Sequence, residues 1–340
     1  MKLYSNEIVF RGHPDKVCDQ ISDALLDEYL KQDKHARCAI EVMGGKEKIF
    51  ITGEVTSTAK VDIESVVKRV LRDIGYSDEY EIVNNLGCQS RDIALGTNEK
   101  VGGAGDQGMM FGFACNDTEE LLPTAMVILQ RLSKWYDEER KACPYLYPDG
   151  KAQITGYYDE EMKLQKIKYF TISYQNDECH REEMDTKIKK KCRKICDDYD
   201  IEIEEFLINP TGKFLIGGFT GDAGLTGRKI VVDSYQSFAK VGGGAFSGKD
   251  PSKVDRSGAY KARELAKRYL KKYNLKWCTV QLSYAIGVVH PLAIYIASDE
   301  GNIEVDASVY EECTPNNIIE DLDLLHTCYE EKARFGHFTD

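Results

Sequence analysis

The segment Gly242–Asp255 combines glycine, lysine and aspartate in a pattern that suits phosphate binding. Its glycines leave the backbone bare, and Asp250 and Pro251 are typical of a helix start, with Asp as the cap and Pro in the first turn. Backbone N–H groups and the helix dipole attract anions at such a start. Lys249 and Lys253 add positive charge one helical turn apart. The segment therefore predicts a phosphate site.

Part of the same segment, Gly243-x4-Gly248-Lys249, matches the beginning of a P-loop. A true P-loop continues with Ser or Thr, whose hydroxyl binds the magnesium ion, and it follows a parallel strand. Asp250 stands at that place here. A P-loop-like phosphotransferase is therefore the second interpretation of this chain and not the first.

Residues 12–16 set an imidazole, a carboxylate and an amine on the first turn of a predicted helix. His13 suits the donation of a hydrogen bond to a phosphate oxygen, and Asp15 suits the binding of magnesium. Lys16 adds positive charge. A lone histidine is usually structural, but its grouping with an acid and an amine at a helix start favours a functional role.

Three further acids are candidates for binding a cation or a polar substrate. Glu41 and Glu54 interrupt two β-rich segments, and their spacing leaves open whether they are simply exposed or hold a cation or a substrate ammonium. Asp222 lies in the glycine-rich stretch 221–229, which ends in an Arg-Lys pair. Asp222 therefore suits a ribose or an amine.

The elements that position these groups follow from hydrophobic periodicity. Helices are predicted at Asp15–Leu30, Val61–Ile74, Pro123–Glu139, Glu183–Cys196 and Pro251–Tyr273. Strands are predicted at Lys48–Thr56, Lys166–Tyr174, Thr279–Ile286 and Leu292–Ala297. The expected class is α+β with antiparallel pairing.

The length of 340 residues predicts two or three modest domains. Glycine-rich stretches at 102–108 and 217–227 lie between segments with ordered patterns, and they mark the expected boundaries. We expect an N-terminal domain at 1–100, a central domain at 104–218 and a C-terminal domain at 219–340, with spatial domains that interleave these segments.

The charge balance narrows the expected partners. With 45 Lys and Arg against 57 Asp and Glu, the formal charge is −12, which argues against a nucleic-acid or anionic-membrane surface. The sequence has no apolar run of about 20 residues and does not open with an apolar leader. The eleven cysteines are scattered and are expected to be free thiols. We expect a cytoplasmic protein without nucleic-acid or membrane partners.

Several motifs, taken together, resemble the methionine adenosyltransferase family, also called S-adenosylmethionine synthetase. They occur in family order and extend to Gly336-His337-Phe338, so the resemblance covers nearly the whole chain. The motifs are Gly-His-Pro-Asp-Lys at 12–16, Gly-Ala-Gly-Asp-Gln-Gly at 103–108, Asn-Pro-Thr-Gly at 209–212, Gly-Asp-Ala-Gly-Leu-Thr-Gly-Arg-Lys at 221–229 and Gly-Gly-Gly-Ala-Phe-Ser-Gly-Lys-Asp at 242–250.

The resemblance implies an enzyme that forms S-adenosylmethionine from ATP and L-methionine, then hydrolyses the triphosphate to phosphate and diphosphate. It implies three α+β domains of similar topology with mainly antiparallel sheets. It further implies a homodimer or a dimer of dimers with active sites shared between subunits. The implied cofactors are two magnesium ions, on Asp15 and Asp255, and one potassium ion, on Glu41.

The same resemblance assigns residues to the substrates. The implied catalytic residues are His13, Lys16, Lys151, Arg228, Lys249 and Lys253. Methionine is expected to meet Glu54, Gln89, Asp222, Lys253 and Ile286. ATP is expected to meet His13, Asp106, Asp149, Lys151, Ser173, Phe214, Asp222, Arg228, Lys229, Ala245 and Lys249, with Phe214 near the adenine. Residues 91–103 correspond to the family's mobile gate over the site.

The chemistry agrees with this inventory. A thioether sulfur carries no proton, so its attack on ribose C5′ needs no general base, and stabilising the departing triphosphate is the main task. The chain departs from the family pattern at Phe10, Arg11, Gln236 and Val241, and its gate loop and C-terminus are shorter. None of these departures removes a matched catalytic residue, so a non-catalytic homologue remains only an alternative.

Overall fold

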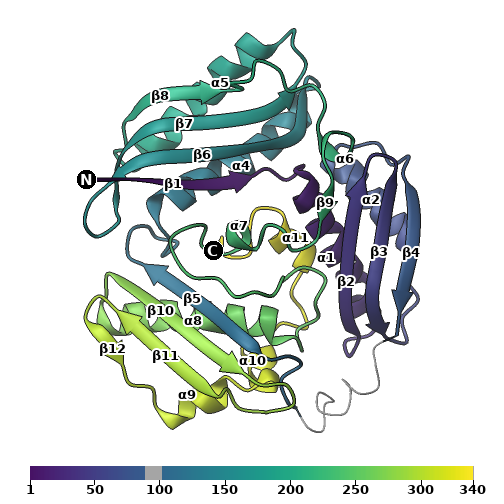
Figure 1. Ribbon diagram of the computed structural model, residues 1–340, viewed down its shortest axis with the longest axis vertical. Coiled ribbons are helices and arrows are strands. Elements are labelled where there is room, and N and C mark those ends of the chain that lie inside the picture. The colour runs from purple at the N-terminus through teal and green to yellow at the C-terminus, as the bar shows by residue number, and fades with distance from the viewer. Residues whose placement is uncertain (89–101, 340) are drawn as a thin grey trace.

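The computed structural model describes residues 1–88 and 102–339. Three four-stranded sheets surround a central region that holds short helices and the C-terminus (Figure 1). The short helices there are α7 (Ile230–Asp233) and α11 (Tyr329–Ala333), and α6 (Gly218–Gly221) lies between sheets A and B. No helix in these two ranges is long and apolar enough to cross a lipid bilayer.

Sheet A has the strand order β1-β6-β7-β8 and is backed by two helices. Its elements are β1 (Lys2–Val9), β6 (Leu146–Tyr158), β7 (Leu164–Asn176), β8 (Ile203–Ile208), α4 (Thr124–Ala142) and α5 (Arg181–Asp197). Alternate residues of the strands pack against the helices in one hydrophobic core. The apolar stripe of α5, which includes Met184, Ile188 and Ile195, faces this core, and its run of lysines faces outward.

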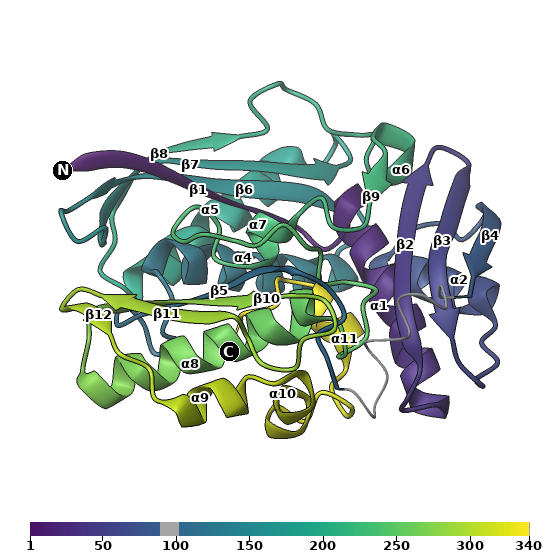
Figure 2. The same ribbon diagram turned by 60° about the horizontal axis from the view of Figure 1, so that its bottom comes forward.

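Sheet B has the order β4-β3-β2-β9, and sheet C has the order β12-β11-β10-β5. Sheet B consists of β2 (Arg37–Gly45), β3 (Lys48–Thr56), β4 (Glu81–Gly87) and β9 (Gly224–Leu225), with α1 (Pro14–Gln32) and α2 (Ile63–Ile74). Sheet C consists of β5 (Gly108–Cys115), β10 (Trp277–Tyr284), β11 (Ala293–Ser298) and β12 (Gly301–Ile303), with α8 (Val254–Tyr273), α9 (Ala307–Glu312) and α10 (Pro315–Asp321). Figure 2 shows α8, α9 and α10 on the same side of sheet C.

The expected α+β class with mainly antiparallel sheets is confirmed. Among the nine pairings between named strands in the described ranges, only β3–β4 and β7–β8 are parallel. Each parallel pair is joined by a crossover helix, α2 or α5, as parallel strands require. Sheets A and B therefore share one motif of helix, hairpin, helix and parallel strand, and sheet C replaces its second half with α9 and α10.

Helices α1, α4 and α8 each follow a strand that belongs to another sheet. β1 precedes α1 but pairs with β6 of sheet A, and β5 precedes α4 but pairs with β10 of sheet C. β9 precedes α8 but pairs with β2 of sheet B. The three units thus exchange one strand each in a cycle. The ranges 1–100, 104–218 and 219–340 stay a prediction for the sequence units, but no sheet is built from one of them alone.

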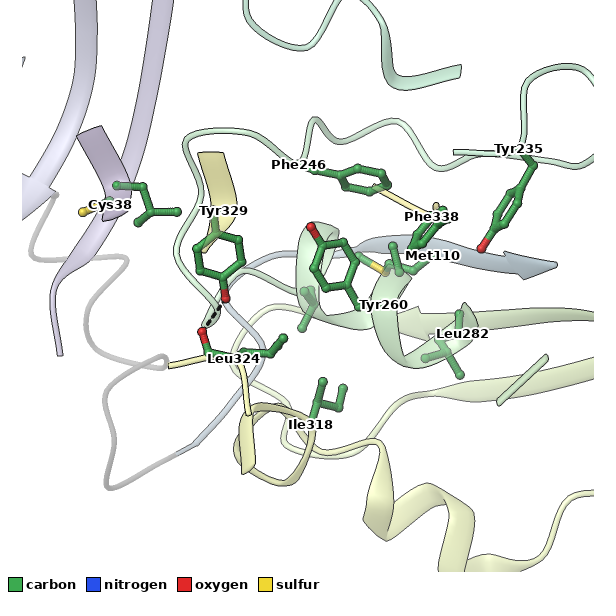
Figure 3. Packing of buried hydrophobic residues seen from close by; sticks show 14 of the residues in the cluster. Cys38, Met110, Tyr235, Phe246, Tyr260, Leu282, Ile318, Leu324, Tyr329 and Phe338 are labelled. Carbon is green, nitrogen blue, oxygen red and sulfur yellow. Dashed lines mark hydrogen bonds between the residues drawn. The ribbon is translucent and has the colours of Figure 1, made fainter. Parts of the chain in front are cut away.

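The shared core of sheets B and C surrounds α1 and α8 (Figure 3). Aromatic rings fill the space between α8 and the C-terminal segment, where Tyr235 stacks on Phe338 with centroids 5.0 Å apart. Tyr329 belongs to the same core and donates a hydrogen bond to the Leu324 carbonyl at 2.6 Å. These contacts fix the last residues of the chain to the middle of the fold.

Helix α1 is almost wholly buried and carries four aspartates at four-residue spacing, on one side of the helix. All four accept backbone N–H hydrogen bonds from segments much later in the chain. The donors are Leu225 to Asp15, Gly227 to Asp19, Gly248 to Asp23, and Tyr329 and Glu330 to Asp27, at 2.8–3.0 Å. We call these residues the aspartate row.

Two aspartates of the row also have buried counter-charges. Asp23 binds the Arg256 guanidinium through both oxygens at 2.8 and 2.6 Å, and both side chains are fully buried. The Lys16 ammonium lies between Asp19, at 3.1 Å, and Asp233. Breaking a buried pair by removing one partner typically costs about 3–5 kcal/mol, so these contacts hold α1, α7 and α8 in fixed relative positions.

Asp27 makes stability depend on pH in a way that an amide variant should abolish. Burial raises the pKa of Asp27 from 3.8 to about 6, although the N–H groups of Glu330 and Tyr329 lower it. Between pH 3.8 and about 6 the folded protein therefore keeps a proton on Asp27 that the unfolded chain has released. The resulting stability is complete below pH 3.8 and is lost as the pH rises through about 6.

Between pH 4 and 7, the free energy of unfolding of the wild type should fall relative to that of Asp27→Asn by on the order of 2–3 kcal/mol. Urea unfolding of both proteins across this range measures the difference. Glu28→Gln makes the same chemical change one residue along and should keep the wild-type slope. A constant difference between wild type and Asp27→Asn would contradict the assignment.

Candidate functional site

Two glycine-rich segments meet along one edge of strand β2. Residues Gly224 and Leu225 of β9 pair with Gly44 and Met43. Further along the same strand, Lys249 forms an antiparallel bridge with Ala39. The flanking backbone hydrogen bonds join Ile40 to Gly248 at 3.0 Å and Asp250 to Cys38 at 3.1 Å. The segments that carry Arg228, Lys229, Lys249 and Lys253 are thereby held to one sheet edge.

The first turn of α1 lies beside this edge, with His13 as the N-cap and Pro14 at the first helical position. The His13 Nδ1 atom accepts a hydrogen bond from the Asp15 backbone N–H at 3.2 Å. Burial, together with the charge of Lys229, lowers the pKa of His13 to about 4. The imidazole is therefore neutral near pH 7, and its single proton lies on Nε2.

Four of the cations expected to bind phosphate, Arg228, Lys229, Lys249 and Lys253, have carboxylate partners. Asp15 accepts hydrogen bonds from Lys229, and the Arg228 Nε atom lies 3.3 Å from its Oδ1. Lys249 binds Asp255 at 2.5 Å. These pairs are partly exposed through their basic members, so an anion can reach the ammonium and guanidinium groups while the aspartates hold them in place.

Lys253 binds Asp250, and this pair corrects one expectation from the sequence. Asp250 does not cap a helix that starts at Pro251, because α8 begins at Val254 with Lys253 as its N-cap. The Asp250 carboxylate accepts instead from the Cys38 N–H, at 2.7 Å, and from the Ser252 N–H, at 2.9 Å. Because Asp250 is bonded to the edge of β2, the helix begins at Val254 and not at Pro251. Lys249 therefore lies beside a strand and not at a helix start.

Residues at the end of sheet A border His13 from the other side. Lys151 lies between Val9 and Ser173 in the strand register. The charges of Lys151 and Asp222 both act on the His13 imidazole. Asp149 accepts the Gly218 N–H at 2.8 Å, and burial raises the pKa of Asp149 to about 6. Sheet A therefore brings Lys151 and Asp149 toward His13, and Asp222 approaches from the segment between α6 and β9.

The two glutamates of sheet B lie on one face, since Glu54 is paired with Ala39 and Glu41 with Thr52. Burial raises the pKa of Glu41, and the nearby Lys249 ammonium lowers it. Glu54 also acts on Glu41 through its charge. Both glutamates thus lie on the same side of the sheet as the Lys249 segment.

Four remaining candidates, Asp106, Phe214, Ala245 and Ile286, lie on loops between the named helices and strands. Phe214 is half-buried, and its carbonyl accepts the Asn176 N–H at 3.0 Å at the end of β7. Ala245 packs against Gly227. Ala104 makes backbone hydrogen bonds of 2.9 Å to both Gly287 and Val288, which links the segment of Asp106 to the turn of Ile286.

A catalytic role for Lys16 finds no support in the geometry. Lys16 is buried, and its ammonium contacts Asp19 and Asp233 and not the phosphate-binding side chains. Gln89 and residues 91–101 of the expected gate lie outside the described residues. Within the described part of the chain, no three His, Cys, Asp or Glu side chains gather as a metal cage.

The sequence interpretation missed the residues that hold the loops. Asp19 fixes Gly227, and Asp23 fixes both Gly248 and Arg256. Arg256 in turn donates to the Lys249 carbonyl at 2.9 Å. The available signal was the occurrence of aspartates every fourth residue along a helix whose other residues are largely apolar.

Three α+β units exchange strands, and a cation-rich site lies beside two of the exchanged strands. Three family models match the chain in order: S-adenosylmethionine synthetase N-terminal domain at 1–93, central domain at 101–214 and C-terminal domain at 216–340. The chain belongs to the S-adenosylmethionine synthetase family, and the resemblance expected from its motifs is confirmed.

Two curated relatives agree with this assignment over nearly their full lengths. A protein of a Nitratiruptor species named S-adenosylmethionine synthase is 43% identical over 364 positions, covering 99% of this chain and 92% of the relative. A protein of the same name from a Nocardioides species is 40% identical over 369 positions, covering 99% of this chain and 93% of the relative.

The conformation of Gly248 should be essential to the site. Its φ is +82°, and a Cβ atom there would lie 2.0 Å from the Ile40 carbonyl oxygen. Gly248→Ala should therefore push the Lys249 segment off the edge of β2 and destabilise the fold by about 2 kcal/mol or more.

Gly243→Ala is the matched control, because a Cβ atom at Gly243 meets no atom within 4 Å. Its free energy of unfolding should stay within about 0.5 kcal/mol of the wild type. Urea unfolding measures both variants. Equal stability of Gly248→Ala and Gly243→Ala would show that the Gly248 contact is unimportant.

Proposed function

We propose that this chain forms S-adenosylmethionine from ATP and L-methionine and then hydrolyses the triphosphate to phosphate and diphosphate. The observation that carries the proposal is the convergence of two cation-bearing loops on one edge of β2, beside the first turn of α1. Membership of the S-adenosylmethionine synthetase family supports it, as do the names of the two full-length relatives.

The reaction needs a stabilised leaving group more than it needs a base. The methionine sulfur forms a bond to ribose C5′ with its own lone pair while the C5′–O bond breaks and the electron pair leaves with the triphosphate. His13 is suited to donate its Nε2–H to the departing oxyanion, because its Nδ1 atom already accepts the Asp15 N–H. Lys249, Lys253, Arg228 and Lys229 neutralise the remaining charge.

The donor set fits two magnesium ions bound together with the triphosphate. Asp15 and Asp255 each pair with lysine or arginine, so each carboxylate lies next to cations that also bind phosphate. Magnesium is commonly held by one or two carboxylates and substrate phosphates, which explains why a cage of three acids is not needed. Bound magnesium would polarise the phosphoryl oxygens. We assign the potassium ion to Glu41, which is half-buried near Glu54.

The substrates are assigned to neighbouring groups of residues around the edge of β2. We propose that methionine contacts Glu54, Asp222, Lys253 and Ile286, with Gln89 from outside the described residues. We propose that the nucleotide contacts Asp106, Asp149, Lys151, Ser173, Phe214 and Ala245 as well as the cations and His13. We propose that Asp222 contacts both substrates, because its charge acts on His13 and on Asp149.

Lys16 receives a positioning role and not a catalytic one. Burial works against its charge, but Asp19 and Asp233 raise the pKa of Lys16 above its ordinary value, so the ammonium stays charged. Asp19 also accepts the Gly227 N–H, next to Arg228. We propose that Lys16 keeps Asp19 ionised and so fixes the loop that carries Arg228 and Lys229.

We also propose that two copies of the chain associate through the open face of sheet B. Leu225, Met43, Phe50 and Val83 are paired in one row across its four strands. Met43, Phe50 and Leu225 are 47%, 39% and 36% exposed, which is unusual for an apolar row. The row shares its face with Glu41 and Glu54, so a partner there would help to enclose the site.

Met43→Glu should weaken this association, because a carboxylate would be buried in the apolar contact. We expect the wild type to sediment as a dimer or a dimer of dimers, and Met43→Glu as a smaller species. Tyr273→Glu, at the end of α8, changes a residue of similar exposure, 44%, and should sediment like the wild type. Unchanged sedimentation of Met43→Glu would rule out this face.

The eleven cysteines are all free thiols, and most of them are buried. Free thiols in such number are typical of a reducing compartment. We therefore propose that the protein works in the cytoplasm.

The direct test is incubation with ATP, L-methionine, magnesium and potassium, followed by mass detection of S-adenosylmethionine and an assay of phosphate and diphosphate. We expect all three products. Formation of ADP in place of S-adenosylmethionine would favour the P-loop-like phosphotransferase, and absence of turnover would favour a non-catalytic homologue.

His13→Ala and Lys249→Ala should each lower kcat by at least about 100-fold, because each removes a donor to the departing triphosphate. Steady-state kinetics with thermal unfolding of each variant separates this effect from misfolding. Lys240→Ala removes an exposed lysine near the same segment and serves as a control that should leave kcat unchanged. Wild-type turnover in His13→Ala or Lys249→Ala would contradict the assigned roles.

A further inference from the structure

A cavity of about 460 Å³ opens between α8 and the C-terminal segment, and none of the residues assigned above to the catalytic site line it. The volume lies in the range of small-molecule sites. Tyr260, Leu324 and Phe338 contribute apolar surface to its lining, and Figure 3 shows Tyr260 beside Phe338. Lys271 and Lys332 are among its polar lining residues.

The cavity has the opposite charge to the molecule as a whole. Its lining includes five lysines and arginines but a single acid, Glu264. The Glu264 carboxylate already pairs with Lys261, at 3.1 Å, and Arg268, at 3.5 Å. Arg268 also pairs with Glu312 at 2.8 Å, and Arg263 donates to three backbone carbonyls, so the cations that we consider for binding are the three lysines. In a chain of net charge −12, such a concentration of basic side chains in a hollow is an electrostatic focus for an anion.

A buried histidine in the lining supplies a second, independent observation. His337 is 3% exposed, and its Nδ1 atom lies 2.6 Å from the Tyr260 hydroxyl. Its Nε2 atom is buried and has no hydrogen-bond partner among the described residues. Burial lowers the pKa of His337, so the ring is neutral. If Tyr260 donates to Nδ1, then Nε2–H is a free donor, and an unmet donor inside a protein is costly.

We propose that this cavity is a second anion site, which binds a small phosphate-bearing molecule through His337 Nε2–H and the lysines of the lining. Lys267 and Lys271 are four residues apart on α8, so their ammonium groups reach the same side of the helix. Lys332 approaches from α11. Cations from two elements around one N–H donor suit the several oxygens of a phosphate better than a single carboxylate.

Calorimetric titration with inorganic diphosphate, in magnesium-free buffer of low ionic strength, tests the proposal. The wild type should bind more than one diphosphate per chain. Lys271→Gln should weaken the second binding event about ten-fold, the loss expected for one charge-assisted hydrogen bond. Lys272→Gln is the matched control, because Lys272 lies over the rings of Tyr269 and Tyr273 and not in the cavity lining.

Two outcomes would overturn the proposal: a single diphosphate per chain in the wild type, or equal binding by Lys271→Gln and Lys272→Gln. The wild type and both lysine variants keep the catalytic site unchanged, so diphosphate binding there does not contribute to the difference between them. Failure of the proposed function would appear in the assay with ATP and methionine and would leave this comparison unchanged.

A second pair of variants tests the histidine itself. His337→Gln keeps an N–H donor near the position of Nε2 and should retain the second binding event within about three-fold. His337→Phe keeps the bulk of the ring but removes the donor, and should weaken binding about ten-fold. Thermal unfolding checks that both variants fold. Equal binding by His337→Gln and His337→Phe would remove His337 from the site, and a variant that does not fold leaves the lysine comparison decisive.

Discussion

The hydrogen bonds from distant backbone N–H groups to the aspartate row of α1 are the contacts on which the rest of the structure depends. Loops rich in glycine have many accessible conformations, and fixing them costs conformational entropy. Ionised carboxylates are strong acceptors, and here each holds one or two N–H groups at a defined point of a rigid helix. The row therefore sets the positions of Arg228, Lys229 and Lys249 relative to His13 on the same helix.

The cyclic exchange of β1, β5 and β9 serves the same end on a larger scale. A strand that joins a neighbouring sheet ties the two units together through a ladder of backbone hydrogen bonds. The site lies where these exchanges meet, next to β9 and the end of β1. A cage for a highly charged substrate needs walls from several elements, and the exchange holds those walls more firmly than side-chain packing between separate domains would.

Local patterns predicted local structure well. The six apolar residues of α2 at helical spacing and the left-handed Gly75 at its end required no knowledge of the rest of the chain. In contrast, β1 pairs with residues about 150 positions away, and its pattern carries no trace of that partner. Asp250 shows the same limit of local patterns. Its neighbours in the sequence predict a helix cap, but in the folded chain its carboxylate accepts the Cys38 N–H at the edge of β2.

The site shows both sides of this limit. Two segments predicted phosphate binding from the sequence alone: the glycines and lysines at 242–253 and the His-Pro-Asp-Lys start of α1. Such groups can be recognised from residue type and short spacing. The role of Lys16 was not readable, because only the folded chain reveals that Asp19 and Asp233 surround it. The sequence gives the sign of each charge, but only the tertiary structure gives the groups that the charged side chain contacts.

The aspartate row has a consequence for the order of synthesis on the ribosome. Helix α1 emerges first, but the N–H groups that satisfy its carboxylates belong to residues between 225 and 330. Until those residues have been made, the N-terminal third must keep its aspartates in water and cannot bury α1. Its final fold, and with it the first turn that carries His13, is reached only when nearly all of the chain has been translated.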